Sequence, residues 1–103
     1  MRYVFHPQAL AEYSEAVQYY AQQRVELAQA FISAVEDAIY RIRESPERWQ
    51  VIDEDIRRCL TRKFPYGILY TIEQDYILIL AIMHCSREPG YWQDRVEPKS
   101  PEI

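Results

Sequence analysis

Long apolar runs are absent from this sequence. No stretch approaches the roughly 18 consecutive apolar residues that a membrane-spanning helix needs. The opening residues, Met1–Pro7, contain neither the apolar core nor the small-residue cleavage site of a secretory signal. These absences predict a cytoplasmic protein that has no membrane partner.

Cysteine is equally scarce, with only Cys59 and Cys85 in the chain. Two cysteines are too few for a disulfide framework, and together with His6 and His84 they show no spacing typical of metal ligands. We therefore expect two reduced thiols, no metal and no cofactor. A thiol nucleophile formed by Cys59 and His84 is disfavoured, because no third group that would orient the histidine is evident.

Glycine is absent before Gly67, and Gly90 is the only other one. This scarcity favours long uninterrupted elements in the first two thirds of the chain. With 103 residues, 49% of them hydrophobic, the chain is long enough for one globular domain. We assign this domain to residues 1–96, and we expect residues 97–103, which include two prolines, to form a frayed tail.

Two amphipathic helices are predicted in the first half. Pro7 suits the first turn of a helix, and a break near residues 22–26 separates this helix from a second one that ends at Ser45, because Pro46 disfavours helical geometry in the residue before it. The apolar stripe of the first helix is Leu10, Tyr13, Val17 and Tyr20, and that of the second is Ala28, Phe31, Ile32, Val35, Ile39 and Ile42.

Strands are predicted at Arg2–His6, Ile56–Lys63, Tyr66–Glu73 and Tyr76–Met83. The turns between the last three are short enough to force antiparallel hairpins, and the last strand, apolar on both faces, should lie inside the sheet. Tyr66, Ile68, Tyr70 and Ile72 should share one face of the middle strand, and Arg58 should share a face with Arg62. Residues 46–55 read as a connector in which Trp49 covers the core.

The predicted fold class is therefore α+β, in the order β-α-α-β-β-β, with a small, mainly antiparallel sheet. The helical hairpin should cover one face of the sheet. Nothing else in the chain is evidently able to cover the other face, so we expect that face to accept a partner.

This order of elements resembles the RelE/ParE superfamily, the toxins of bacterial type II toxin–antitoxin modules. The resemblance rests on four fragments: Phe5-x-Pro7-x-Ala9, the pair Tyr19-Tyr20, Arg62-x-Phe64-Pro65-Tyr66-x-Ile68-x-Tyr70, and His84-x-x-Arg87-x-Pro89-x-Tyr91-Trp92-x-x-Arg95. It implies a growth-inhibiting toxin that a cognate antitoxin neutralises. ParE-like members poison DNA gyrase, and RelE-like members are ribosome-dependent endoribonucleases that cut mRNA without metal. A third possibility is an inactive scaffold that only binds its antitoxin.

Each activity implies its own site residues. A ribonuclease would use His84 for proton transfer, Arg62 and Arg87 to stabilise the phosphate, and Tyr91 to stack on a base. A gyrase poison would use Arg87, Tyr91, Trp92 and Arg95 to bind its target. The structural alternatives are a strand-end hydrogen bond for His84, ion pairs with Glu88 or Asp94 for Arg62 and Arg87, and burial of Trp92 against the sheet.

Charge favours the gyrase reading. The net charge is −4 and the pI is about 5.1, with five arginines against ten acidic residues in positions 1–55 and six basic against four acidic residues in positions 56–96. Lys63 is the only lysine before the tail. Binding to RNA depends on many phosphate contacts by Lys and Arg, whereas binding to a protein needs only a local patch of arginine and aromatic side chains.

Overall fold

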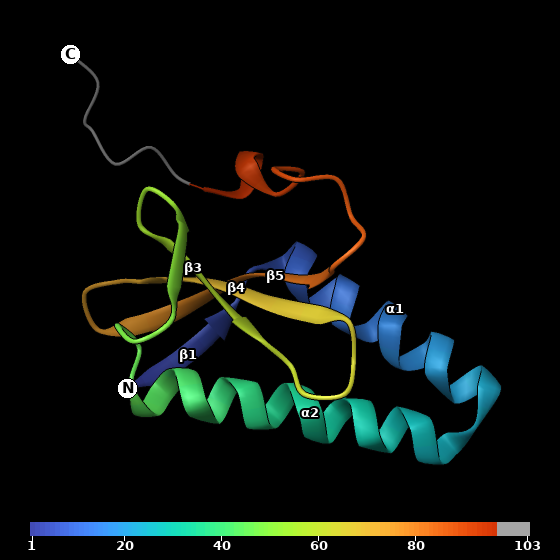
Figure 1. The fold of residues 1–103 in the computed structure, drawn as a ribbon. Helices are drawn as coiled ribbons and strands as arrows, with labels where there is room; N and C mark the ends of the chain where they lie inside the picture. The colour runs from blue at the N-terminus through green and yellow to red at the C-terminus, as the bar shows by residue number, and fades with distance from the viewer. Residues whose placement is uncertain (97–103) are drawn as a thin grey trace.

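The computed structural model describes residues 1–96 and confirms the α+β class (Figure 1). The elements are β1 (Arg2–Phe5), α1 (Pro7–Gln23), α2 (Val25–Glu44), β2 (Gln50–Asp53), β3 (Ile56–Leu60), β4 (Tyr66–Ile72), β5 (Tyr76–His84) and a short 3-10 helix (Gln93–Arg95). The strand order is β1-β5-β4-β3-β2, with β1 parallel to β5 and the other neighbours antiparallel. The predicted tail, residues 97–103, lies outside the described residues. No helix within residues 1–96 is long and apolar enough to cross a membrane.

The helical hairpin forms as predicted, with one error in its apolar stripe. His6 caps α1 by accepting a hydrogen bond at Nδ1 from the backbone N–H of Gln8 (3.1 Å), and the extended backbone of Arg24 separates the two helices. Leu10 was predicted to face the core but is 54% exposed. Ala9 and Ala16 are buried instead, because small side chains let α1 approach the sheet closely.

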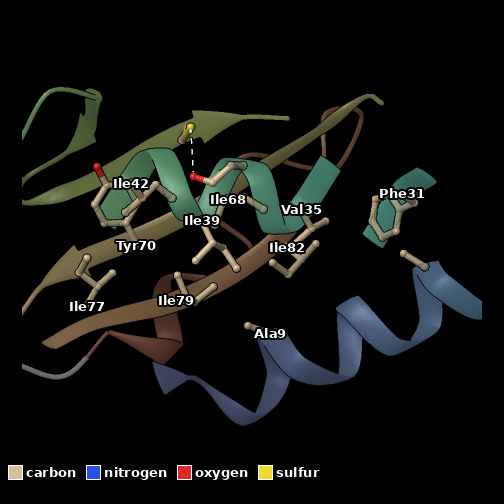
Figure 2. Packing of buried hydrophobic residues seen from close by; sticks show 13 residues of the cluster. Ala9, Phe31, Val35, Ile39, Ile42, Ile68, Tyr70, Ile77, Ile79 and Ile82 are labelled. Atoms are coloured by element: carbon tan, nitrogen blue, oxygen red, sulfur yellow. Dashed lines mark hydrogen bonds between the residues drawn. The ribbon is translucent and has the colours of Figure 1, made fainter. Parts of the chain in front are cut away.

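The first hydrophobic cluster fills the space between the helices and the sheet. Figure 2 shows Val35, Ile39 and Ile42 of α2 pointing towards the sheet. The prediction that alternate residues of β4 share one face is confirmed, because this cluster contains Ile68 and Tyr70 and is flanked by Tyr66 and Ile72.

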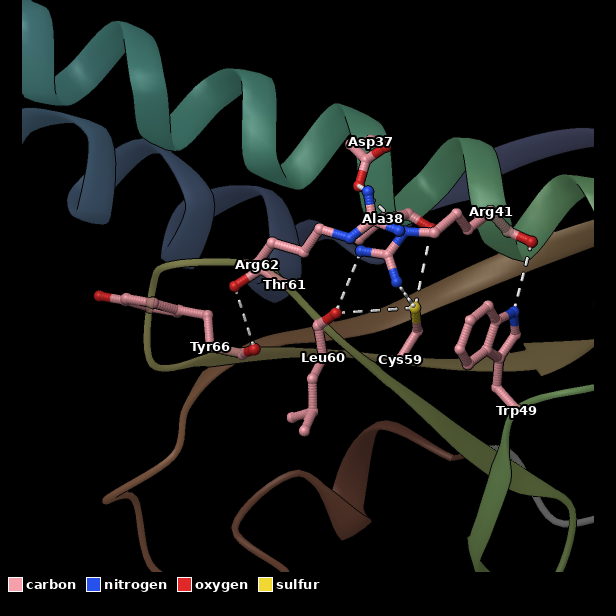
Figure 3. Close-up of polar contacts among 9 residues, drawn as sticks. All are labelled: Asp37, Ala38, Arg41, Trp49, Cys59, Leu60, Thr61, Arg62 and Tyr66. Atoms are coloured by element: carbon pink, nitrogen blue, oxygen red, sulfur yellow. Dashed lines mark hydrogen bonds and ion pairs between the residues drawn. The ribbon is translucent and has the colours of Figure 1, made fainter.

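Arg41 ties α2 to β3 at the edge of this cluster (Figure 3). Its Nε pairs with Asp37 Oδ2 (3.0 Å), its Nη2 donates to the carbonyl of Leu60 (3.2 Å), and its Nη1 lies 3.5 Å from the sulfur of Cys59. Burial raises the pKa of the Cys59 thiol and outweighs the opposite effect of the Arg41 charge. This cysteine therefore serves as a packed core residue. Trp49 covers the core as predicted, with Nε1 donating to the carbonyl of Arg41 (3.3 Å).

Strand β2 was missed by the sequence analysis, which assigned residues 46–55 to a connector. It pairs antiparallel with β3, with Gln50 opposite Arg58 and Val51 opposite Arg57. The strand is only four residues long, and its pairing with β3, rather than an alternating pattern of its own, defines it.

The opposite face of the sheet is not bare, so the prediction that nothing in the chain covers it is wrong. A second hydrophobic cluster lies there, made of Ile56, Leu69, Leu80, Ala81, Met83 and Trp92. Trp92, which is 4% exposed, comes from the chain after β5, and Figure 1 shows this chain crossing the sheet on the side away from α2. The covering segment is irregular apart from one short 3-10 turn, so periodicity gave no signal for it.

A β-bulge in β5 decides which residues reach each face. Leu69 of β4 pairs with Ala81, but the next residue, Tyr70, pairs with Ile79, which leaves Leu80 without a partner on β4. The alternation therefore shifts by one position. Ile77, Ile79 and Ile82 pack on the helix side, whereas Leu80, Ala81 and Met83 pack on the other side. His84, two residues after Ile82, consequently faces α1.

Replacing Tyr70 by Phe should lower the free energy of unfolding by about 1 kcal/mol. The Tyr70 ring is fully buried, and its hydroxyl donates a hydrogen bond to the carbonyl of Pro46 (2.6 Å) that ties the end of α2 to β4. Urea denaturation measures the change. Tyr40→Phe, at a ring that is 60% exposed, is the matched control, and equal midpoints for the two variants would contradict the assignment.

Candidate functional site

The candidate site is built on the segment that follows β5, residues 85–96. The segment begins by anchoring to the β3–β4 turn, where the backbone N–H of Cys85 donates to the carbonyl of Pro65 (2.8 Å). Gly90 then adopts a left-handed conformation (φ 82°) that other residues rarely take. This turn brings Tyr91 and Trp92 back over the sheet, so that Trp92 enters the second cluster.

Arg95 is held in a buried ion pair with Glu12 of α1. Nη2 of Arg95 lies 2.8 Å from Oε2 of Glu12, Nη1 lies 3.0 Å from Oε1, and Nη1 also donates to the carbonyl of Leu80 (3.0 Å). The Arg95 side chain is 8% exposed and that of Glu12 14%. Burial lowers the pKa of Arg95, but the hydrogen bonds and charge of Glu12 outweigh it, so the net shift is upward.

The ion pairs considered for Arg62 and Arg87 do not form with Glu88 or Asp94 within residues 1–96, and Arg62 pairs with Asp37 instead. Arg95, for which no ion pair was predicted, pairs with a residue 83 positions away in the chain. The side chains of Arg95 and Trp92 are largely buried, and in the structure they hold segment 85–96 in place. Their predicted role in target binding stays a prediction.

Tyr91 lies against two guanidinium groups. The guanidinium carbon of Arg87 is 3.7 Å from the centroid of the Tyr91 ring, and that of Arg95 is 5.0 Å away. The Tyr91 hydroxyl is buried beside Glu12, and within residues 1–96 it forms no hydrogen bond of ordinary geometry. Burial raises the pKa of Tyr91, and the nearby Glu12 carboxylate raises it further. Arg87 itself is exposed.

His84 and Arg87 share a small pocket of about 190 Å³ on the helix side of the sheet. Nδ1 of His84 accepts a hydrogen bond from the backbone N–H of Ser86 (3.0 Å), so the neutral ring carries its proton on Nε2. The strand-end hydrogen bond considered for His84 is therefore present. The carboxylates of Glu12 and Glu15 also line this pocket.

Arg62 lies apart from these residues. It does not line the pocket that contains His84, and its Nη1 lies 3.6 Å from Asp37 Oδ2 of α2, with the side chain 70% exposed (Figure 3). The prediction that Arg58 and Arg62 share a face is wrong, because β3 ends at Leu60 and Arg58 points to the side away from the helices.

A second pocket, which the sequence analysis missed, lies on that other side. We call it the cationic groove: it has a volume of about 390 Å³, and its lining includes the cations Arg58 and Arg87, one carboxylate, Asp53, and the side chains of Met83 and Trp92. Within residues 1–96 neither arginine forms an ion pair. A side chain at position 67 would approach the Arg58 stem to 3.2 Å, so Gly67 gives Arg58 room to cross β4. Gly67 lies in β4 beside the arginine-containing strand β3. A glycine at this place was the sequence signal that could have predicted the groove.

Comparison with known proteins identifies the family. The family model described as "ParE toxin of type II toxin-antitoxin system, parDE" matches residues 3–89. No curated protein gives a significant match. Among solved structures, a chain of the chromosomal ParDE TA system from P. aeruginosa superposes with a TM-score of 0.71 at 14% identity, covering 82% of this chain and 95% of that one, which supports the fold. Since the family model spans most of the described residues, the chain belongs to the ParE toxin family of type II toxin–antitoxin systems.

Proposed function

We propose that this protein inhibits growth by poisoning DNA gyrase and that a cognate antitoxin neutralises it. Membership of the ParE toxin family supports the toxin role. Fold alone does not choose the target, so the choice of gyrase rests on the chemistry of the two pockets.

The observation that carries the choice is the acidic lining of the pocket around His84. An RNA phosphate placed beside His84 and Arg87 would also meet the carboxylate of Glu15, while the charge of Glu12, which lines the same pocket, is neutralised by Arg95. Arg62, the second cation expected to hold the phosphate, is paired with Asp37 instead. With a net charge of −4, the chain also gains little from counterion release on a polyphosphate surface.

The cationic groove has the composition of a protein-binding patch. Two arginines that form no ion pair within residues 1–96 flank a floor that includes Met83 and Trp92. Arginine, methionine and aromatic residues are enriched at protein interfaces. We assign direct contact with gyrase to Arg58, Arg87 and Tyr91, and a supporting role to Trp92 and Arg95.

Ribosome-dependent mRNA cleavage is the second candidate function. One observation favours it: His84 and Arg87, a proton-transfer group and a phosphate-binding group, line the same pocket. In this reading Tyr91, stacked on Arg87, would help to place the RNA, and no metal would be needed.

The test is to incubate the purified protein with gyrase and supercoiled plasmid and to measure the trapped cleaved DNA. The wild-type protein should produce linear DNA. Arg87→Ala should reduce trapping at least about tenfold, because truncating one hot-spot residue typically costs 2 kcal/mol or more. Arg24→Ala removes the same charge at an exposed position between the helices and should trap DNA like the wild type.

Two outcomes would contradict gyrase poisoning. Codon-positioned mRNA cuts after induction, lost in His84→Ala, with no trapped DNA, would establish the second candidate. Normal growth of cells that contain soluble protein, with neither DNA trapping nor mRNA cuts, would leave only an antitoxin-binding scaffold.

A further inference from the structure

We propose that Glu12 is a positioning residue for two of the side chains proposed to contact gyrase. Acting through Arg95, it fixes the ring of Tyr91 and the guanidinium group of Arg87 at the end of the sheet. The inference rests on the proposed function only for its activity assay. Glu12 was not singled out by the sequence, and its role follows from a set of contacts that joins three parts of the chain.

The first step is the carboxylate of Glu12 itself. Oε1 accepts hydrogen bonds from the backbone N–H of Ile82 (3.0 Å) and from Nη1 of Arg95 (3.0 Å), and Oε2 accepts one from Nη2 of Arg95 (2.8 Å). A single side chain of α1 thereby binds both β5 and segment 85–96. Three charge-assisted hydrogen bonds leave this carboxylate little freedom.

The second step is the open edge of β5. Strand β1 pairs with β5 only as far as Phe5 opposite Ile79, so the following residues of β5 have no strand neighbour on that side within the described part of the chain. The bulged residue Leu80 offers its carbonyl there and Ile82 offers its N–H. Arg95 binds the carbonyl and Glu12 binds the N–H. The side chains of the ion pair therefore supply hydrogen-bond partners that a neighbouring strand would otherwise provide.

The third step leads from Arg95 to the target site. The guanidinium group of Arg95 lies over the Tyr91 ring, and the ring in turn carries the guanidinium group of Arg87 at 3.7 Å. Arg87 is exposed and has no ion pair within residues 1–96. The Tyr91 ring is therefore the contact that orients it.

Loss of the Glu12 charge should release this arrangement. Arg95 would remain buried without a counter-charge, a state that is costly, and the segment that carries Arg95 would move towards water. Tyr91 and Arg87 would move with it, although the first hydrophobic cluster, on the helix side of the sheet, would stay packed. Glu12→Gln is the appropriate variant, because glutamine keeps the shape and an acceptor for the N–H of Ile82.

The position of the segment is measured first, without any target. In a Trp49→Phe background Trp92 is the only tryptophan, and acrylamide quenching reports its exposure. Glu12→Gln should raise the quenching constant at least about twofold while the circular dichroism spectrum stays native. The control is Val35→Ala, a cavity in the helix-side cluster that lowers stability but should leave Trp92 protected.

Gyrase trapping by Glu12→Gln, Arg95→Gln and the double variant then tests how the residues are coupled. Each single variant should trap at least about tenfold less DNA than the wild type. The double variant should be no worse than Arg95→Gln alone, because residues that act through one another are not additive. A purely structural effect would instead follow the loss of stability, and the Val35→Ala control would share it.

The outcomes separate this inference from the proposed function. If the wild-type protein traps no gyrase, the proposed function fails and the quenching experiment alone judges the role of Glu12. If Glu12→Gln leaves Trp92 as protected as in the wild type, or if the losses of the two single variants multiply in the double variant, the positioning role is overturned while gyrase poisoning stands.

Discussion

Replacing Trp92 by Ala is expected to lower the free energy of unfolding by about 3–5 kcal/mol and to abolish gyrase trapping. Trp92 is 4% exposed and is the largest side chain buried in the second cluster, where it packs with Leu69, Leu80 and Met83. No other aromatic ring is fully buried in that cluster, so its removal leaves a large cavity between segment 85–96 and the sheet. The segment carries Arg87 and Tyr91, which should lose their positions when it detaches.

Urea denaturation and the trapping assay, run at a temperature at which the variant is folded, measure the two effects. Trp92→Phe is the conservative comparison and should retain most of the stability and the trapping, because it keeps a ring in the cluster. A loss below about 0.5 kcal/mol in Trp92→Ala, the size of an ordinary surface substitution, would show that the second cluster does not hold the segment.

The protein should also unfold cooperatively as the pH rises from 10 to about 12. Burial, with smaller contributions from Glu36 and Tyr3, raises the pKa of Tyr13 from 10.0 to about 12. Burial is also the main cause of the raised pKa values of Tyr70 and Tyr91. In this pH range the folded protein keeps protons on these hydroxyls that the unfolded chain has lost.

The sign follows from this difference. The stabilisation is complete below pH 10, the pKa of tyrosine in the unfolded chain, and it is lost as the pH rises through the folded values. One pKa unit corresponds to about 1.4 kcal/mol, but Tyr13 is only partly buried, so solvent screening reduces the energy that its shift represents. Total stabilities of small domains are about 5–15 kcal/mol, so the losses from Tyr13, Tyr70 and Tyr91 together should destabilise the folded chain strongly.

Circular dichroism and tyrosinate absorbance, recorded on the same samples, measure this transition. Part of the absorbance change should coincide with the loss of helix. Tyr13→Phe should move the unfolding midpoint to higher pH, whereas Tyr40→Phe, at an exposed ring, should leave it in place. Complete ionisation of the tyrosines before any loss of helix would contradict the prediction.

The two faces of the sheet present different surfaces, and Arg87 lies where these surfaces meet. This residue lines both the pocket around His84 and the cationic groove. Substitutions at His84 and Arg58 therefore test the two sides independently, while substitutions at Arg87 affect both. Trp92 and Arg95 lie beyond residues 3–89, the part that the family model matches. The family match therefore gives no information about the two side chains that hold segment 85–96.

Local patterns in the chain were sufficient for the main elements. The spacing of apolar residues predicted both helices, and Pro7 and Pro46 predicted the start of the first and the end of the second. The short turns predicted the hairpins of β3, β4 and β5, and the continuous apolar run predicted the inner place of β5. These features depend on neighbours within a few residues, so a single sequence contains the information.

The candidate site was only partly predictable. His84 and Arg87 do share a pocket, and Arg87 does stack on Tyr91, as their closeness in the sequence suggested. Arg62 and Arg58 were placed on one face because strict alternation was assumed through the end of β3. Glu12 gave no signal at all, because its partners Ile82 and Arg95 lie at least 70 residues away.

Tertiary structure decided the rest. The bulge at Leu80 shifts the alternation of β5, and this shift turns His84 towards α1 and Met83 towards the cationic groove. A one-residue change of register moves every following side chain to the other face, and the register is set by pairing across strands rather than by the composition of β5. The covering of the second face by Trp92 likewise depends on a fold-back that only long-range contacts with the sheet and with Glu12 stabilise.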